Sequence, residues 1–277
     1  MEHKKWIKRI LKKGRELFSH SISENGENYS GQADTRSSQQ NTIQQHDAGT
    51  LHIFTLEDTK PETEIEEASP EERRMRVFSD GWRKSFDDPE RVIREFSKIR
   101  VKEEFKLEAY QFVEGENGNG IVWAIPADQP LPEPEECKRL SEYLLSPPKP
   151  EMALDDFMEA IDGDGSPLSY LQAALAYHEL QEFGAMWHGV SWWESEILTS
   201  DNTYEWEFTE GHSMPDLMDP HFYYNSEGKP VVVFHTLNPI GSASLSRHEH
   251  TFEPSRYGMK FKRITLGYAK NAKIIIF

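Results

Sequence analysis

The chain has 277 residues, of which 36 % are hydrophobic, and a formal net charge of −17. This length allows one large or two modest domains with a substantial core, whereas the low hydrophobic fraction predicts that part of the chain is not packed. The acidic balance argues against a nucleic-acid ligand, because binding phosphates requires Lys and Arg, and it favours a basic protein partner.

The charge differs between the N-terminus and the rest of the chain, and the cysteine content indicates the cellular compartment. The first twenty residues carry a net charge of +5, so the remainder carries −22. Cys137 is the single cysteine, which excludes a disulfide framework and a thiolate metal site and favours a reducing compartment. The sequence has neither a secretory signal nor a run of 18 apolar residues. We therefore expect a cytoplasmic protein.

The N-terminal segment predicts a short basic amphipathic helix within residues 1–18. Its apolar residues fall roughly on one face: Trp6, Ile10, Leu11, Leu17 and Phe18. Such a helix makes a weak contact with an anionic membrane surface, docks on a partner, or is a solvated terminus. Residues 19–50 are rich in Ser, Gln, Asn and Gly, which predicts a flexible linker. Residues 51–277 are then expected to form a single globular domain.

The first half of this domain alternates predicted strands and helices. A short strand is expected at 51–56, helices at 70–86 and 89–99, and a hairpin of strands 107–113 and 121–125 around a Gly-rich loop at 114–120. A proline-rich segment over 126–150 follows, with a short helix near 137–145. Another helix is expected at 153–161.

The stretch 168–187 predicts the central helix of the fold. Ser166 is suited to cap it, and Pro167 suits the first helical position. Most of its circumference is apolar, which is typical of a helix buried between other elements. Four of its six clearly polar residues fall on one narrow stripe that we expect to face outward: Ser169, Gln172, Glu179 and Glu182.

The C-terminal part predicts strands. Aromatic and polar residues alternate over 204–208, the period of a half-buried strand. Hairpins are expected from 222–224 with 231–235, and from 261–268 with 274–277. The predicted fold class is α+β, a mainly antiparallel sheet with helices packed on one side.

Two histidine patterns raise the alternative of a metal-dependent hydrolase. Residues 178–182, HELQE, differ at the last position from the zinc-binding HExxH helix. On a strand, His248 and His250 would point to one face, with His235 or His212 as a third ligand. The simpler interpretation is polar residues on the outer stripe of a helix and an exposed polar loop. We therefore expect no catalytic residue, no metal and no cofactor.

The segment after the central helix is the predicted partner-binding site. Aromatic and acidic residues gather there: Trp192, Trp193, Glu194, Glu196 and Asp201. Aromatic residues inside an acidic rim are typical of binding hot spots for a basic protein. The alternative is that both tryptophans are buried in the core.

Residues 116–126, ENGNGIVWAIP, resemble the E-N-Q-G-V-x-x-W-x-I element of the SUKH superfamily. Residues 153–158 and 173–184 are similar to later helices of that family, so the resemblance spans about 105–190. It implies a SUKH-like fold, a scaffold motif of Glu116, Asn117, Gly120 and Trp123, and a non-enzymatic immunity protein that neutralises a bacterial toxin. In this interpretation the glycines make a turn, and the helix containing Tyr177 packs across Trp123.

Overall fold

The computed structural model describes residues 50–60, 81–114, 117–143, 145–184 and 195–274, all within one compact unit, Ala48–Phe277. The predicted helix within 1–18 lies outside the described residues, and so does the predicted linker over 19–50 except for Thr50.

A small antiparallel sheet forms the first half of this unit. Its strands, in the spatial order β2-β4-β5, are β2 (Gly81–Lys84), β4 (Phe105–Glu114) and β5 (Asn117–Pro126). The predicted hairpin is confirmed, but its loop is shorter than expected because Glu114 already pairs with Asn117. The predicted helix over 70–86 is wrong for residues 81–84, which form β2; residues 70–80 lie outside the described part.

A second, larger sheet is built almost entirely from the C-terminal half. Its seven strands are β1 (His52–Ile53), β9 (Glu196–Leu198), β10 (Trp206–Phe208), β11 (His221–Tyr224), β12 (Pro230–Asn238), β13 (Ser244–Phe252) and β14 (Met259–Ala269). The spatial order is β1-β11-β12-β13-β14-β10, with β9 paired to β12, and every pair is antiparallel. β14 pairs with β13 and β10, and the second strand of the predicted hairpin after residue 268 lies outside the described residues apart from Ile274.

Helices are few and mostly short in the described part. They are α3 (Glu90–Arg94), α4 (Pro167–Gln181) and the 3-10 turns η1 (Glu57–Thr59), η2 (Pro134–Glu136) and η3 (Phe157–Ala160). Short strands replace parts of three expected helices: β3 (Ile99–Val101), β6 (Lys138–Arg139) and β8 (Ile161–Gly163). β3 pairs with β8, and β6 pairs with β7 (Pro148–Lys149).

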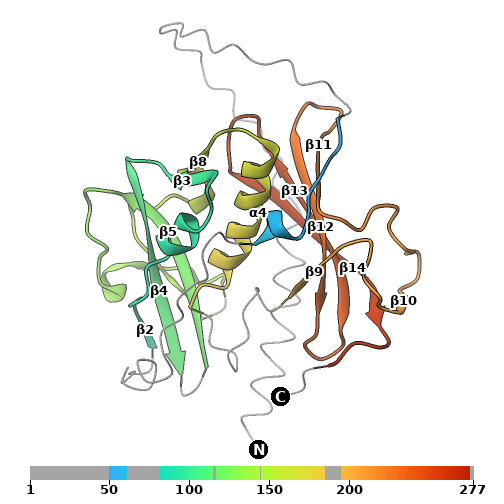
Figure 1. The fold of residues 1–277 in the computed structure, drawn as a ribbon. Coiled ribbons are helices and arrows are strands. Elements are labelled where there is room, and N and C mark those ends of the chain that lie inside the picture. The colour runs from blue at the N-terminus through green and yellow to red at the C-terminus, as the bar shows by residue number, and fades with distance from the viewer. Residues whose placement is uncertain (1–49, 61–80, 115–116, 144, 185–194, 275–277) are drawn as a thin grey trace, which may run out of the picture. The chain divides into compact units, whose positions relative to one another are not determined.

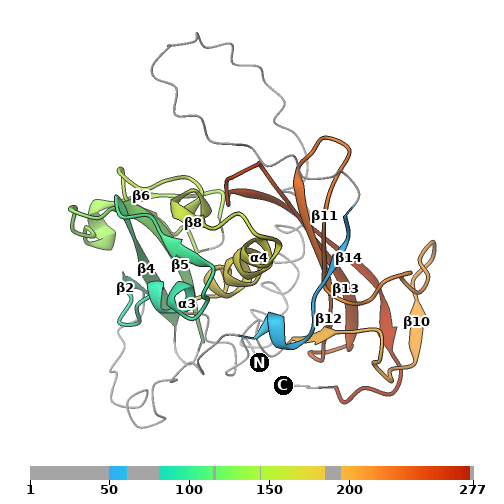
Figure 2. The same ribbon diagram turned by 45° about the horizontal axis from the view of Figure 1, so that its top comes forward.

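The protein is therefore mostly antiparallel sheet with few helices, and α4 lies between the two sheets. Figure 1 shows α4 in yellow, with the small sheet in green on one side and the large sheet in orange and red on the other; Figure 2 shows the same arrangement nearly along the helix. One continuous apolar cluster joins residues of β5, α4 and β12, such as Val122, Leu175 and Phe234. The helix thus contributes to the packing of both sheets, whereas the sequence predicted helices on one side of one sheet.

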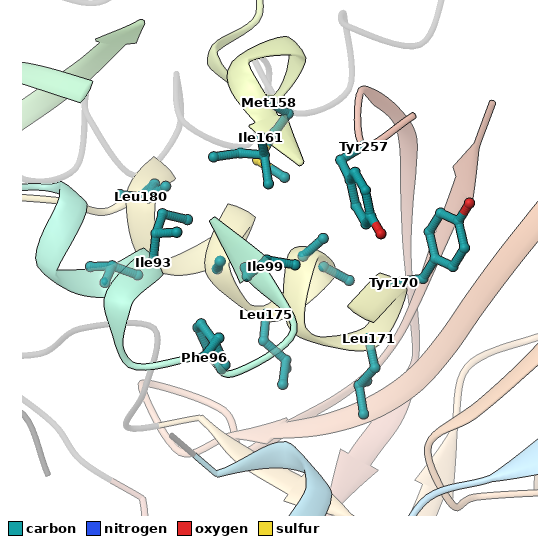
Figure 3. Packing of buried hydrophobic residues seen from close by; sticks show 14 of the residues in the cluster. Ile93, Phe96, Ile99, Met158, Ile161, Tyr170, Leu171, Leu175, Leu180 and Tyr257 are labelled. Atoms are coloured by element: carbon teal, nitrogen blue, oxygen red, sulfur yellow. The ribbon is translucent and has the colours of Figure 1, made fainter. Parts of the chain in front are cut away.

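Burial of α4 confirms its prediction as the central helix. The expected outward stripe is wrong for Ser169 and Gln172 but not for Glu182, which is exposed. Leu171 and Leu175 are fully buried, and Figure 3 shows them on α4 in the same cluster as Ile93 of α3 and Ile161 of β8. Ser169 and Gln172 are buried as well. Each has a specific partner, because the Ser169 hydroxyl lies 2.7 Å from the Tyr257 hydroxyl and Gln172 Oε1 accepts from the Lys98 amide at 2.8 Å. Polar groups are tolerated in a core when they are paired in this way.

Candidate functional site

The acidic charge of the chain is concentrated in one stretch. Residues 150–228 contain 17 Asp and Glu and no Lys or Arg. The rest of the chain holds 31 acidic and 31 basic residues. This stretch therefore carries the whole formal net charge of −17, and a search for charge balance in shorter windows would have found it from the sequence.

Part of that charge is neutralised by basic residues from elsewhere in the fold. Lys149 pairs with Asp155, Arg100 with Asp162, and Lys98 with Asp164 at 3.4 Å. These pairs lie near the start of the stretch, before α4.

The carboxylates of residues 196–216 are different, because within the described ranges they have almost no basic partner; Glu227, further along the stretch, pairs with Lys229 at 3.5 Å. Glu207 lies 3.9 Å from Lys270, a long and exposed contact that contributes little. The other exposed carboxylates of this region form no ion pair in the described part of the chain: Glu196, Asp201, Glu205, Glu210 and Asp216. We call these six residues the acidic surface.

Aromatic side chains alternate with two carboxylates of the acidic surface along the chain. Tyr204, Trp206 and Phe208 alternate with exposed residues along β10 and its approach, as the period-2 pattern predicted. All three are half-buried and pack against a second apolar cluster that includes Leu198 and Leu245. The region therefore combines half-buried aromatic rings with exposed carboxylates, the composition of a protein-binding surface for a basic partner.

Hydrogen bonds hold two of these carboxylates in place. The Tyr204 hydroxyl donates to Glu196 at 2.5 Å, and this bond, with burial, raises the pKa of Tyr204 to about 12. The Thr199 hydroxyl donates to Asp201 at 2.5 Å and lowers the pKa of that carboxyl. Both acids are thus held in defined positions.

The predicted partner site overlaps this surface only in part. Glu196, at the start of β9, and Asp201, in the turn after it, are exposed and belong to it. Trp192, Trp193 and Glu194 lie outside the described residues.

A second group of chemically active residues lies in the core between α4 and β13. His178 Nε2 is 2.9 Å from His250 Nε2, and the ring centroids of His178 and His248 are 5.1 Å apart. The rings of Phe234 and Phe261 stack on those of His248 and His250. The exposed fractions of His248 and His250 are 1 % and 0 %. The expected outer stripe at His178 and the expected polar loop at 248–250 are therefore both wrong, since all three imidazoles are part of the core.

Burial keeps these imidazoles neutral. Desolvation lowers the pKa of His250 to about 3 and holds the pKa values of His178 and His248 well below the usual range, with further lowering from Arg263 and neighbouring histidines. In the described ranges, no group of three His, Cys, Asp or Glu side chains is arranged to hold a metal.

The other two histidines considered as ligands lie elsewhere. His235 pairs with Arg247 across the strands, so it points to the sheet face opposite His248. His212 is exposed between β10 and β11. His235 and His212 thus do not join His248 and His250 in one site.

The residues of the proposed scaffold motif do not have the expected roles, in which the glycines make a turn and Trp123 packs against the helix that contains Tyr177. Glu116 lies outside the described part, and Asn117 begins β5. Gly120 lies within β5, where an added Cβ would be 1.8 Å from the Phe183 carbonyl oxygen. Trp123 faces away from α4: its Nε1–H donates to the Pro148 carbonyl at 2.9 Å, and its ring belongs to a separate cluster under the proline-rich segment. The expectation that the Tyr177 helix crosses Trp123 is therefore wrong.

Neither α3 nor α4, the two α-helices of the described ranges, is both long and apolar enough to cross a membrane. Comparison of the chain with protein-family models, curated proteins and solved structures found no match.

Proposed function

We propose that this protein is a non-enzymatic binding module whose partner is a basic protein, and that the partner docks on the acidic surface. The observation that carries the proposal is the set of exposed carboxylates, without basic partners apart from the long Glu207–Lys270 contact, together with the aromatic residues of β10. Fields of opposite sign speed encounter, and aromatic residues at the centre of such a surface supply most of the affinity.

The more specific form of this proposal is an immunity protein with a SUKH-like fold that neutralises a bacterial toxin domain in the cytoplasm. Its support is the resemblance over residues 105–190 and the single cysteine. Residues 1–18, with their basic character, would add at most a weak contact with an anionic membrane surface.

The test is binding of the full chain to a basic cytotoxic domain encoded beside it, measured by calorimetry at low salt. Reversal of two fixed carboxylates, Glu196→Lys with Asp201→Lys, is expected to weaken binding by more than tenfold. The matched control reverses two exposed acids of the β3–β4 connection, Glu103→Lys with Glu104→Lys, and is expected to change affinity little.

The two double variants change the net charge equally. Comparing them therefore distinguishes an effect of the acidic surface itself from an effect of the net charge of the protein. Equal loss in both pairs, or loss in neither, would contradict the acidic surface as the docking site. Melting temperatures of all variants are expected to match that of the original chain, because these side chains are exposed.

A further inference from the structure

Within the described ranges, the outer edge of β10 is an open strand edge. β10 is the last strand in the spatial order of the large sheet and pairs with β14 alone. Figures 1 and 2 both show it at the outer end of that sheet. No strand of the described ranges lies against its other side.

Hydrogen bonds around β10 identify which backbone groups face that open edge. The Glu205 carbonyl accepts from the Lys270 amide at 2.8 Å, and the Thr209 amide donates to the Leu266 carbonyl at 2.9 Å. Residues 205, 207 and 209 thus direct their backbone groups toward β14. Because these directions alternate along an antiparallel strand, the amide and carbonyl groups of Trp206 and Phe208 point to the open edge.

The position of β10 against β14 is tightly fixed. A Cβ added at Gly267 would lie 2.4 Å from the Glu207 carbonyl oxygen, so a larger residue there would push the strands apart. The open edge is therefore presented at a defined place instead of on a loosely attached segment.

The side chains of β10 restrict what can pair with that edge. Glu205 and Glu207 are exposed on one face, and Trp206 and Phe208 are half-buried on the other. Acids on an edge strand repel an identical edge and so oppose self-association. The same acids attract lysine or arginine at the facing positions of a different strand.

We infer that β10 binds an extended segment of the partner as an additional strand, and that this segment alternates basic with apolar residues. This inference rests on the proposed function and specifies the partner segment. Basic side chains would lie beside Glu205 and Glu207, while the apolar ones would extend the cluster under Trp206 and Phe208. Backbone bonds to the strand edge supply affinity, and the alternating side chains supply specificity.

The test uses two capped hexapeptides of equal composition and the full chain. One alternates lysine and valine; the other has three lysines followed by three valines. The alternating peptide is expected to bind at least tenfold more tightly at low salt. Its binding is expected to slow hydrogen exchange at the amides of Trp206 and Phe208 and to leave exchange in β2 unchanged.

A charge-reversed variant, Glu205→Lys with Glu207→Lys, is expected to lose the preference for the alternating peptide. The Glu103→Lys with Glu104→Lys control is expected to keep it. Equal binding of both peptides, or no change in exchange at β10, would overturn strand addition while the proposed binding of a basic protein could still hold in the calorimetric test. Failure of that calorimetric test would instead refute the proposed function itself.

Discussion

At the scale of single residues, the buried histidines show how context sets the chemistry of a side chain. His178 contacts both His248 and His250, and phenylalanine rings stack on the latter two. Charging any of them would place a cation in an apolar core beside two other imidazoles and near Arg263. Spacing in the sequence could show that His248 and His250 share a face if they lie on a strand, but not that His178 would meet them there.

This cluster predicts a loss of stability in acid. The pKa of His250 is about 3 in the fold and about 6.5 when unfolded, so protons favour the unfolded chain. The contribution of His250 to the free energy of unfolding is complete above about pH 6.5. It declines as the pH falls toward 3, by up to about 1.4 kcal/mol per pH unit. His250→Gln is expected to reduce the decline in unfolding free energy between pH 6 and 4, measured by urea titration.

The exposed histidine His212 supplies the control for this measurement. His212→Gln is expected to keep the pH dependence of the original chain. Identical slopes for the original chain and His250→Gln would show that the cluster does not control acid stability.

Gly120 carries a second prediction at this scale. Its Cβ position is occupied by the backbone of Phe183, which cannot move without moving the end of α4. Gly120→Ala is expected to destabilise the protein by about 1–3 kcal/mol, the usual cost of overpacking. Gly258→Ala is the control, because its nearest atoms are side-chain atoms at 3.6 Å, and thermal denaturation should show little change for it.

At the scale of elements, the sequence predicted α4 well and β13 not at all. A proline-started, largely apolar run gives α4 a strong local signal. In β13, His248 and His250 alternate with Arg247 and Glu249. Because all four residues are polar, the sequence here lacks the alternation of apolar and polar residues by which a strand is recognised. Its inward face became clear only from the packing of α4 and Phe234. The acidic surface was found in part, through Glu196 and Asp201, because charge is visible in sequence whereas a sheet edge is not.

The burial of α4 predicts that truncation of its side chains is costly. Leu175 has an exposed fraction of 0 % in the cluster that joins both sheets. Leu175→Ala is expected to lower the unfolding free energy by about 2–5 kcal/mol. Tyr143→Ala, at a side chain that is 54 % exposed, is the control and should change the denaturation midpoint little. An unchanged midpoint for Leu175→Ala would contradict the central position of the helix.

At the scale of the whole molecule, charge is distributed so that one stretch of the chain determines the net field. Residues 150–228 carry 17 acids without a basic residue, and the remainder is balanced. A basic partner approaching this protein is therefore attracted mainly toward that stretch, and shorter-range contacts with the aromatic residues of β10 follow.

The field predicts a strong salt dependence of association. The rate constant for a basic partner, measured by stopped-flow fluorescence, is expected to fall by about tenfold or more as ionic strength rises through about 0.15 M. Dissociation should change much less, because it depends on close contacts. A rate constant independent of salt would contradict electrostatic steering.

The position of α4 between two sheets has a consequence for synthesis on the ribosome. Translation delivers β1, the small sheet and α4 before any strand from β9 to β14 exists. Tyr170 and His178 are covered in the finished fold by Phe222, Phe234 and Phe252, all made later. Until the strands from β11 to β13 have left the ribosome, one side of the central helix is therefore not fully covered. The nascent chain passes through a stage with an exposed apolar helix face, the kind of surface to which chaperones bind.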